Sequence, residues 1–361
     1  MSDVLVAGGG PSGLAAAIAL AERGVDAVVV DSTGGVSSQR GELLAHGAFD
    51  IMGRLGLAHV LTSALRIEDV VSRWGAARTQ AHDGVPGLGF HGWGLDRQAL
   101  SQAMLDRANR LGIPVLQARI TAHHQTDDGW RVEATGAAGA QALHARYLID
   151  ATGRPAAVAR RQGATLLQDT DLVAVLWHSA QRTGPAQMQA EAMGQGWWYA
   201  VPYGAGRTIG FVTSAATAKA INAATPAFLA QAADTMELIS LKSLSRPMGV
   251  MDCRNALLDR MSGTGWLATG DAAAAFDPIA SQGLFNALSG GFFAGQAAAD
   301  VLSGDPDAAL VYEALAARTA ERTHTMTHLQ YAARPCDTRF WQERSGPLAT
   351  ASPRLPNPAF G

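Results

Sequence analysis

The sequence has few charged residues, almost no lysine and only two cysteines. Charged side chains make up 16% of its 361 residues, and the formal net charge of −3 argues against nucleic acid as a partner. Cys253 and Cys336 lie far apart, which is typical of a reducing compartment rather than of a disulfide framework. Nearly all basic residues are arginine, and the only lysines are Lys219 and Lys242.

Long hydrophobic runs are also missing. The longest, such as residues 14–21, fall well short of the roughly 20 apolar residues that span a membrane. Asp3 and the glycines near it make a targeting segment unexpected. Because 48% of the residues are hydrophobic, the chain can bury a core without disulfides. We therefore expect a cytoplasmic α/β protein of about two domains.

The strongest motif lies in the first 31 residues. Residues 3–7 predict a buried strand, residues 14–23 a helix and residues 25–30 a second strand. Between the first strand and the helix the sequence matches G-x-G-x-x-G, the pattern of a dinucleotide-binding turn. This turn consists of Gly8, Gly9, Gly10, Pro11, Ser12 and Gly13.

Each part of this motif has a physical role. Gly8 permits the tight turn, Gly10 lets the backbone approach a pyrophosphate, and Gly13 lets the helix pack closely on the strand. The helix N-terminus offers free N–H groups and a positive dipole end to phosphates. Asp31 ends the second strand and can accept hydrogen bonds from a ribose diol. The motif therefore predicts a dinucleotide site, without distinguishing NAD from FAD.

A segment far along the chain points to FAD. Residues 266–269 predict a strand that runs into Gly270 and Asp271, and residues 286–302 predict a helix. An acid at a strand end can bind a ribityl hydroxyl, and a glycine at a helix start brings N–H groups to a flavin carbonyl. The further candidate contacts are Pro278, Gln282, Gly283 and Leu284. No second G-x-G-x-x-G occurs, since residues 204–206 are better interpreted as a hairpin turn.

These two segments together resemble the FAD-binding fold of the aromatic hydroxylases typified by p-hydroxybenzoate hydroxylase. Further segments resemble one branch of this monooxygenase/halogenase superfamily, which contains flavin-dependent halogenases and the flavoprotein maturation enzymes of tryptophylquinone oxidases. The maturation enzymes are the closer match. The segments are Arg40-Gly41-Glu42, Leu95-Asp96-Arg97, residues 149–154 (Ile-Asp-Ala-Thr-Gly-Arg), residues 196–202 (Gly-Trp-Trp-Tyr-Ala-Val-Pro) and residues 340–344 (Phe-Trp-Gln-Glu-Arg).

The resemblance implies an α/β fold, in which a Rossmann-like FAD domain of the glutathione-reductase type carries an inserted mixed β-sheet substrate domain. Apolar runs at residues 172–178, 197–203, 208–213 and 247–252 predict strands of the insert, and residues 226–238 predict a helix that covers it. We expect a discontinuous FAD domain over residues 1–72, 97–167 and 260–305. The substrate domain would take residues 73–96 and 168–259, followed by C-terminal helices and a tail over residues 306–361.

The resemblance also suggests roles for charged residues. Arg40 and Arg97 would approach the FAD ribose or pyrophosphate, for which a guanidinium fork is suited, although a surface salt bridge is the alternative. Glu42 could lie beside the flavin or cap a helix. His46 follows Glu42 by four residues in an expected helix, so the two could share a face and serve in acid–base catalysis.

Two other histidines, His91 and His178, are alternative bases. His324 and His328 stand four residues apart on an expected helix, but no Glu or Cys completes a zinc motif. We therefore expect no metal site.

Aromatic residues of the middle region could line a pocket for an aromatic substrate, or else fill the core. They are Trp93, Trp177, Trp197, Trp198 and Tyr199. Strand alternation puts Trp197 and Tyr199 on one face and Trp198 on the other. We therefore predict that Trp197 or Tyr199 faces the substrate.

The resemblance implies an FAD-dependent monooxygenase that hydroxylates a tryptophan- or indole-like ring through a flavin C4a-hydroperoxide. The substrate could be free, carrier-bound or peptidyl, and electrons would come from NAD(P)H or from a separate flavin reductase. Halogenases of this family use a lysine between FAD and substrate, and this chain has no lysine before Lys219, so halogenation ranks lower. A flavin dehydrogenase or double-bond reductase and a non-catalytic flavoprotein remain alternatives.

Overall fold

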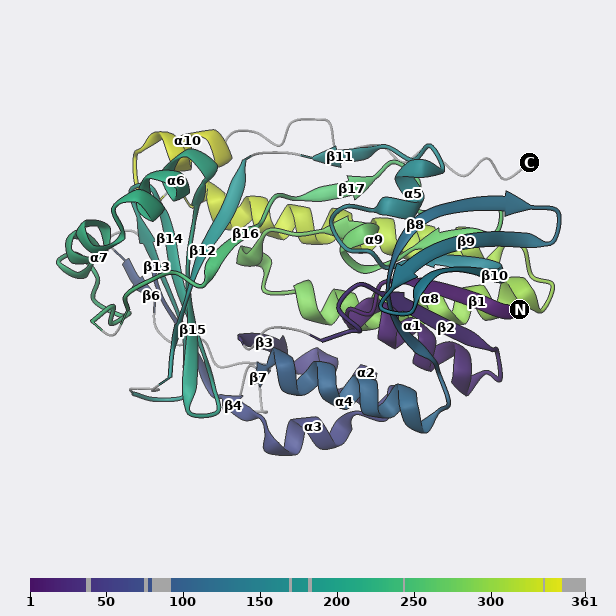
Figure 1. Cartoon of the computed structure of the whole chain (residues 1–361). Coiled ribbons are helices and arrows are strands. Elements are labelled where there is room, and N and C mark those ends of the chain that lie inside the picture. Colours follow the sequence, from purple (N-terminus) through teal and green to yellow (C-terminus); the bar gives the residue numbers. More distant parts are fainter. Residues whose placement is uncertain are drawn as a thin grey trace.

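Two units lie side by side in the computed structural model, an α/β unit that contains the N-terminus and a second unit dominated by a sheet (Figure 1). The structure describes residues 1–36, 40–74, 77–79, 92–168, 171–180, 184–242, 244–333 and 335–345. His91 and the expected C-terminal tail beyond residue 345 lie outside these ranges. No helix of the described ranges is long and apolar enough to cross a membrane.

The α/β unit is built on a seven-stranded sheet with a parallel centre. Strand β1 pairs in parallel with β2 and with β10, and the sheet continues in parallel to β8 beyond β2 and to β19 beyond β10. Its strands are β1 (Ser2–Ala7), β2 (Ala27–Asp31), β8 (Val115–Thr126), β9 (Gly129–Gly136), β10 (Gly139–Asp150), β18 (Ser262–Gly263) and β19 (Trp266–Ala268). The parallel strands are continuous apolar runs because both faces of the sheet are covered.

Close packing of two helices supports the glycine-rich turn. Helix α1 (Pro11–Glu22) begins at the turn, and α8 (Gly283–Leu302) packs along it. A Cβ atom on Gly291 or Gly295 would overlap the backbone oxygen of Ser12 or Ala16. The small residues of both helices therefore allow direct backbone contact, and this contact joins the two segments from which an FAD site was predicted.

The other helices of this unit differ in what they cover. Helix α4 (Arg97–Arg110) packs against α1, and α9 (Ala308–Ala332) packs against α8 and extends toward the second unit (Figure 1). The shorter helices are α2 (Phe49–Arg54), α3 (Ala58–Ser63) and α5 (Ala157–Arg161). The prediction of C-terminal helices after residue 306 agrees with α9 and α10 (Arg339–Arg344).

A mixed seven-stranded sheet forms the second unit, as predicted. Its strand order is β16-β12-β15-β14-β13-β5-β6. Among the described strand pairs of this sheet, only β13–β5 is parallel. The strands are β5 (Asp69–Trp74), β6 (Ala77–Thr79), β12 (Leu172–Ser179), β13 (Gln187–Met193), β14 (Gly196–Tyr203), β15 (Gly206–Ser214) and β16 (Gly249–Asp252). The expected hairpin turn between β14 and β15 is confirmed.

Two helices cover one face of this sheet, where a single helix was expected. Helix α6 (Ala215–Ala223) precedes α7 (Thr225–Ala233), and the Ser214 side chain caps α6 by accepting a hydrogen bond from the Thr217 N–H. The expected helix over residues 226–238 is therefore too long at its C-terminal end. Beneath α6 and α7, Trp177 and Trp198 pack with Phe211 in an apolar core.

Two small sheets complete the fold, and one corrects a prediction. They consist of β3 (Gly41–Ala45), β4 (Leu65–Ile67) and β7 (Gly92–Asp96), and of β11 (Leu166–Gln168), β17 (Ala256–Leu258) and β20 (Ala274–Ala275). The helix expected across Glu42 and His46 is wrong, because residues 41–45 pair with β7 and His46 begins a 3-10 turn. Long-range strand pairing overrides local helix preference here. The domain boundaries stay a prediction.

Asp150, at the end of β10, is expected to be a major contributor to stability. Its fully buried carboxylate accepts hydrogen bonds from the Thr152 N–H and hydroxyl and from the N–H groups of Val158 and Ala159. Asp150→Asn would place an amide donor against one pair of donors and leave them unsatisfied. We expect a loss of about 2 to 4 kcal/mol in urea unfolding. The exposed Asp128→Asn is the control, and equal stability of both variants would contradict this role.

Candidate functional site

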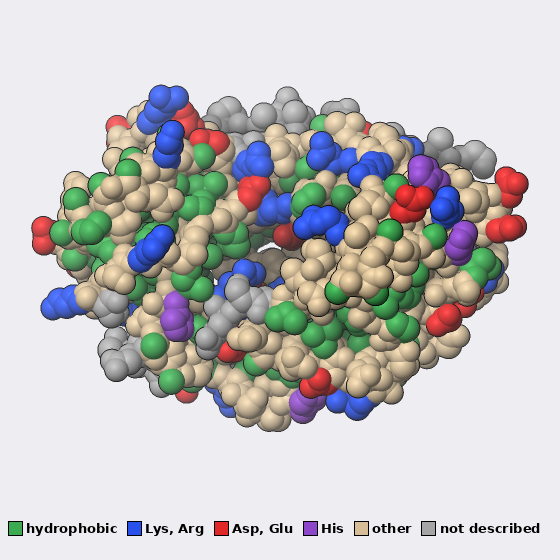
Figure 2. Space-filling view, in the orientation of Figure 1, with side chains coloured by type: hydrophobic (Ala, Val, Ile, Leu, Met, Phe, Trp, Pro, Cys, Tyr) green, Lys and Arg blue, Asp and Glu red, His purple; other side chains and the backbone are tan. Residues whose placement is uncertain are grey.

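A cavity of about 450 Å³ lies between the α/β unit and the second sheet. Figure 2 shows the surface hollowed between the two units, with basic and acidic side chains at the edge of the hollow. The lining includes most of the predicted cofactor contacts: Gly8, Gly10, Pro11, Ser12, Asp31, Arg40, Arg97, Asp271, Pro278, Gly283 and Leu284. The structure therefore brings together two predicted segments that are more than 200 residues apart in the chain.

The glycine-rich turn divides its tasks between packing and access. Gly8 has a φ of +113°, and a Cβ atom there would overlap the carbonyl oxygen of Ala151. A Cβ atom on Gly13 would overlap the carbonyl oxygen of Gly8, so Gly13 lies beneath the cavity rather than in its wall. Gly10 differs, because no described atom lies within 4 Å of its Cβ position. The open side of the turn is therefore at Gly10.

Asp31 is held at the rim of the cavity as an ionised acceptor. One carboxylate oxygen accepts the Gly9 N–H at 2.8 Å, and the other accepts the N–H groups of Thr33 and Gly35. Burial acts to raise the pKa of Asp31, but these bonds and the Thr33 hydroxyl outweigh burial and lower it. This geometry suits the predicted contact with a ribose.

Glu42 forms a charged cluster with Arg40 and Arg97 inside the cavity. Arg40 Nε lies 2.6 Å from Glu42 Oε1, and Arg97 Nη1 lies 3.1 Å from Glu42 Oε2. Burial acts to raise the pKa of Glu42, but the two guanidinium groups outweigh it and lower the pKa. A lowered pKa makes Glu42 a weak proton acceptor. The ion pairs therefore favour an electrostatic role over the predicted acid–base role.

The candidate histidines do not join this cluster. His46 stacks on Trp93 with ring centroids 5.9 Å apart, and it is not among the described residues that line the cavity. His178 hydrogen-bonds to the Tyr203 hydroxyl at 2.9 Å and borders a separate pocket. Within the described lining there is no histidine. The structure therefore does not bring His46 to the cavity beside Glu42, and it gives no support to the two residues as a catalytic pair.

The second sheet supplies one wall of the cavity, which we call the aromatic wall after Trp197 and Tyr199. It consists of Leu176, Met188, Trp197, Tyr199, Val201 and Met251. Trp197 and Tyr199 share the face that lines the cavity, and Trp198 lies on the opposite face, as strand alternation predicts. Trp93, Trp177 and Trp198 are not among the described residues that line the cavity, so of the two alternatives they fill the core. These three belong to apolar cores of the two units.

A hydrogen-bonded chain behind the aromatic wall was not predicted. The Trp197 indole N–H donates to the Tyr331 hydroxyl at 3.2 Å, and that hydroxyl donates to Asp277 Oδ2 at 2.8 Å. Trp341 packs against Tyr331 and donates its indole N–H to the Met193 carbonyl oxygen at 2.8 Å. The Phe-Trp-x-x-Arg segment of the C-terminus therefore supports the wall from behind. The sequence analysis identified this segment by its resemblance but predicted no role for it.

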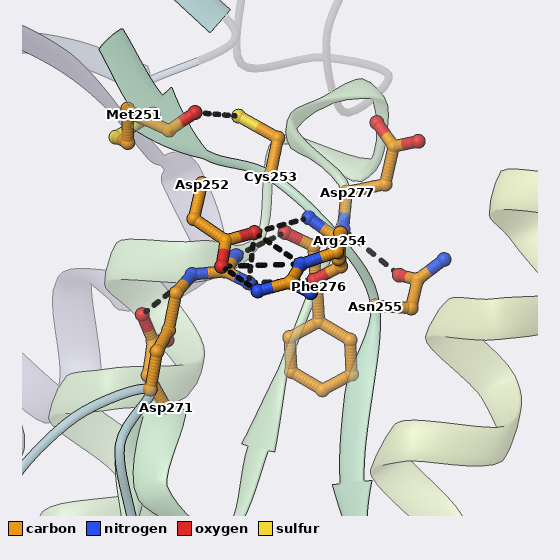
Figure 3. Close-up of polar contacts among 9 residues, drawn as sticks. Met251, Asp252, Cys253, Arg254, Asn255, Asp271, Phe276 and Asp277 are labelled. Atoms are coloured by element: carbon orange, nitrogen blue, oxygen red, sulfur yellow. Dashed lines mark hydrogen bonds and ion pairs between the residues drawn. The ribbon is translucent and has the colours of Figure 1, made fainter. Parts of the chain in front are cut away.

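The Asp271 segment forms the side of the cavity next to α8. Asp271 is open to the cavity but surrounded by protein, and this desolvation raises its pKa. Gly270 borders a neighbouring pocket, while Gln282 is absent from the described cavity lining. Arg154 and Cys253 line the cavity and were not predicted as site residues. Figure 3 shows Asp271 near Asp252, which comes from the segment that ends β16, while the Cys253 side chain points toward Met251.

Comparison with protein families identifies the family of this chain. A family model described as an FAD-binding domain matches residues 1–327. The chain belongs to this FAD-binding family. The cofactor is therefore FAD, and the cavity fits it in two respects: Gly10 leaves open space at the helix N-terminus, and the buried Arg97 Nε has no hydrogen-bond partner among the described residues.

Several solved structures share the fold. CmlS, a flavin-dependent halogenase, superimposes with a TM-score of 0.83 at 20% identity, covering 98% of this chain and 69% of that one. The myxobacterial chondrochloren halogenase CndH gives 0.85 at 20% identity, covering 97% and 87%. The peptidyl tryptophan dihydroxylase QhpG gives 0.74 at 23% identity, covering 96% and 79%. Comparison with curated proteins finds no significant match. These identities establish the shared fold alone.

Proposed function

We propose that this member of the FAD-binding family is a monooxygenase that hydroxylates a neutral, electron-rich aromatic ring, with tryptophan or another indole first among candidates. The observation that carries the proposal is the aromatic wall, in which Trp197 and Tyr199 line the same cavity as Asp271 and Leu284. Aromatic side chains favour a flat aromatic ligand through offset or edge-to-face contacts. Bound FAD would supply the redox chemistry, because a reduced flavin activates dioxygen.

The residues of the wall would orient the ring and exclude water. Tyr199 and Cys253 both line the cavity, and burial raises the pKa of each well above its ordinary value. Both groups therefore stay protonated near neutral pH and do not serve as bases. Because the described lining also contains no histidine, any base there would be a carboxylate. An indole is electron-rich without ionisation, which fits this wall.

A halogenase is the second candidate, since CmlS and CndH share the fold. Lys219 lies on the solvent side of α6, which covers the face of the sheet that carries Trp198. Lys242 is exposed, and neither lysine is among the described residues that line the cavity. The halogenases that the sequence resembles use a lysine between FAD and substrate. The positions of these lysines therefore support the monooxygenase.

Purified protein supplied with FAD tests this proposal. Tryptophan, indole and tryptophan-containing peptides should each be offered with NADH, NADPH or a separate flavin reductase, in buffers with and without halide. The name of QhpG, a peptidyl tryptophan dihydroxylase, is the reason to include peptides. We expect a product that is heavier by oxygen atoms alone and whose formation does not depend on halide.

Other products would separate the alternatives. A brominated or chlorinated product that forms only with halide would overturn the proposal in favour of halogenation. A product that differs from the substrate by two hydrogens would indicate a dehydrogenase or a double-bond reductase. Protein that binds FAD but oxidises no reductant with any of these substrates would also contradict the proposed reaction, while leaving cofactor binding intact.

A further inference from the structure

Arg154 connects three segments that meet at the cavity. Its Nη1 donates to the Arg254 carbonyl oxygen at 2.6 Å and lies 3.5 Å from Asp252 Oδ1. Its Nη2 donates to the Phe276 carbonyl oxygen at 3.4 Å, and its Nε lies 3.9 Å from Asp271 Oδ2. Figure 3 shows the four partners of this guanidinium close together. The loop after β10 is thereby joined to the end of β16 and to the Asp271 segment.

The charges around Asp271 make Arg154 its main partner. Three other charged residues also face Asp271. They are Glu42 in β3, Arg40 just before β3, and Arg97 at the start of α4. The two arginines are paired with Glu42, so their attraction for Asp271 is offset by a nearby negative charge. Arg154 is the cation within 4 Å of Asp271 among the ion pairs of the described residues. The Arg154 side chain is 20% exposed and that of Asp271 is 45% exposed toward the cavity, so solvent screens the pair on the Asp271 side.

We propose that Arg154 is a positioning residue for FAD, which holds Asp271 as a carboxylate turned into the cavity and fixes it relative to strand β16 of the aromatic wall. Asp271 would then accept a hydrogen bond from a hydroxyl of the cofactor. The proposal depends on FAD binding and is independent of the reaction that the enzyme catalyses.

The titration of Asp271 gives the proposal a specific consequence. Burial raises the pKa of Asp271, and Arg154 is the strongest influence that opposes this rise. Without Arg154 the pKa would rise further, and Asp271 would take up a proton at a higher pH than in the natural protein. Because a protonated carboxyl group is a poorer acceptor, affinity for FAD would then fall as the pH falls.

Arg154→Met tests this by equilibrium titration of FAD, followed through quenching of flavin fluorescence from mildly acidic to mildly alkaline pH. We expect the dissociation constant to rise about tenfold at neutral pH and further in acid, with recovery in alkali. Arg254→Met is the matched control, since Arg254 also pairs with Asp252 but is not among the described cavity residues. It should stay within about twofold of the natural protein at every pH.

Two further variants distinguish positioning from a merely structural role. Asp271→Asn cannot titrate, so combining it with Arg154→Met should remove the pH dependence. Arg154→Gln can still donate to the carbonyl oxygens, so it should stay folded even if Arg154→Met does not. It should show the same pH dependence as Arg154→Met. An affinity that is unchanged, or that falls by one factor at all pH values, would overturn the proposal. Persistence of the pH dependence in the Asp271→Asn background would do so as well.

Discussion

Gly10→Val is expected to abolish FAD binding while leaving the fold intact. The backbone at Gly10 has φ −70° and ψ −179°, an extended conformation that valine adopts without strain. No described atom lies within 4 Å of the Cβ position, so the protein itself has room for the side chain. That room is the place where the turn and the N-terminus of α1 face the cavity, and where the backbone must approach a pyrophosphate.

The loss should be at least about a hundredfold in the dissociation constant, or about 2.7 kcal/mol. Unfolding of the apoprotein should change by less than about 1 kcal/mol. Gly47→Val is the matched control, because Gly47 also has an open Cβ position but is exposed and away from the described cavity lining. Retention of FAD by Gly10→Val at natural affinity would show that the cofactor does not cross this turn.

Gly13→Ala, in contrast, is expected to destabilise the fold itself. Its Cβ atom would overlap the carbonyl oxygen of Gly8, so the helix and the strand would have to separate. This contrast shows how much the motif spacing could reveal. The motif predicts that Gly10 gives access and that Gly13 permits packing, and the structure has an open Cβ position at Gly10 and a blocked one at Gly13.

Local patterns were sufficient for the elements that carry the FAD site. The strand before Gly8, the helix after it and the strand that ends in Asp31 correspond to β1, α1 and β2. The strand before Gly270 corresponds to β19, and the long helix after it corresponds to α8. These elements are predictable because buried parallel strands are continuous apolar runs, and because the turn requires glycine at fixed positions.

Long-range packing explains what the sequence could not predict. Strand alternation separates Trp198 from Trp197 and Tyr199, but it does not say which face α6 and α7 cover. The strand at Glu42 depends on pairing with β7, more than fifty residues away. The contact between Tyr331 and Asp277 is similarly remote, so no local pattern marks it. Such features depend on tertiary structure rather than on periodicity.

Gly210→Ala is expected to lower turnover strongly while sparing FAD binding. Gly210 in β15 lies directly opposite Tyr199 in β14, and the Tyr199 ring packs over it. A Cβ atom on Gly210 would overlap the ring and lie 2.6 Å from the Tyr199 hydroxyl oxygen. Because Tyr199 lines the cavity, displacing its ring would change the space proposed for the substrate. Overpacking of this kind costs about 1 to 3 kcal/mol of stability.

We expect kcat/KM for the aromatic substrate to fall about a hundredfold, because a displacement of about 1 Å in a substrate-orienting group has effects of that size. The FAD dissociation constant should change much less than kcat/KM, because Gly210 itself is not among the described residues that line the cavity. Gly249→Ala on β16, where a Cβ atom meets nothing within 4 Å, is the matched control.

A double variant decides whether Tyr199 causes the loss. In the Gly210→Ala background, Tyr199→Ala removes the displaced ring, so turnover should return to the level of Tyr199→Ala alone. Such non-additivity is the signature of two residues in direct contact. Natural turnover in Gly210→Ala would show instead that the substrate does not occupy the cavity beside Tyr199, and the aromatic wall would then lose its proposed role.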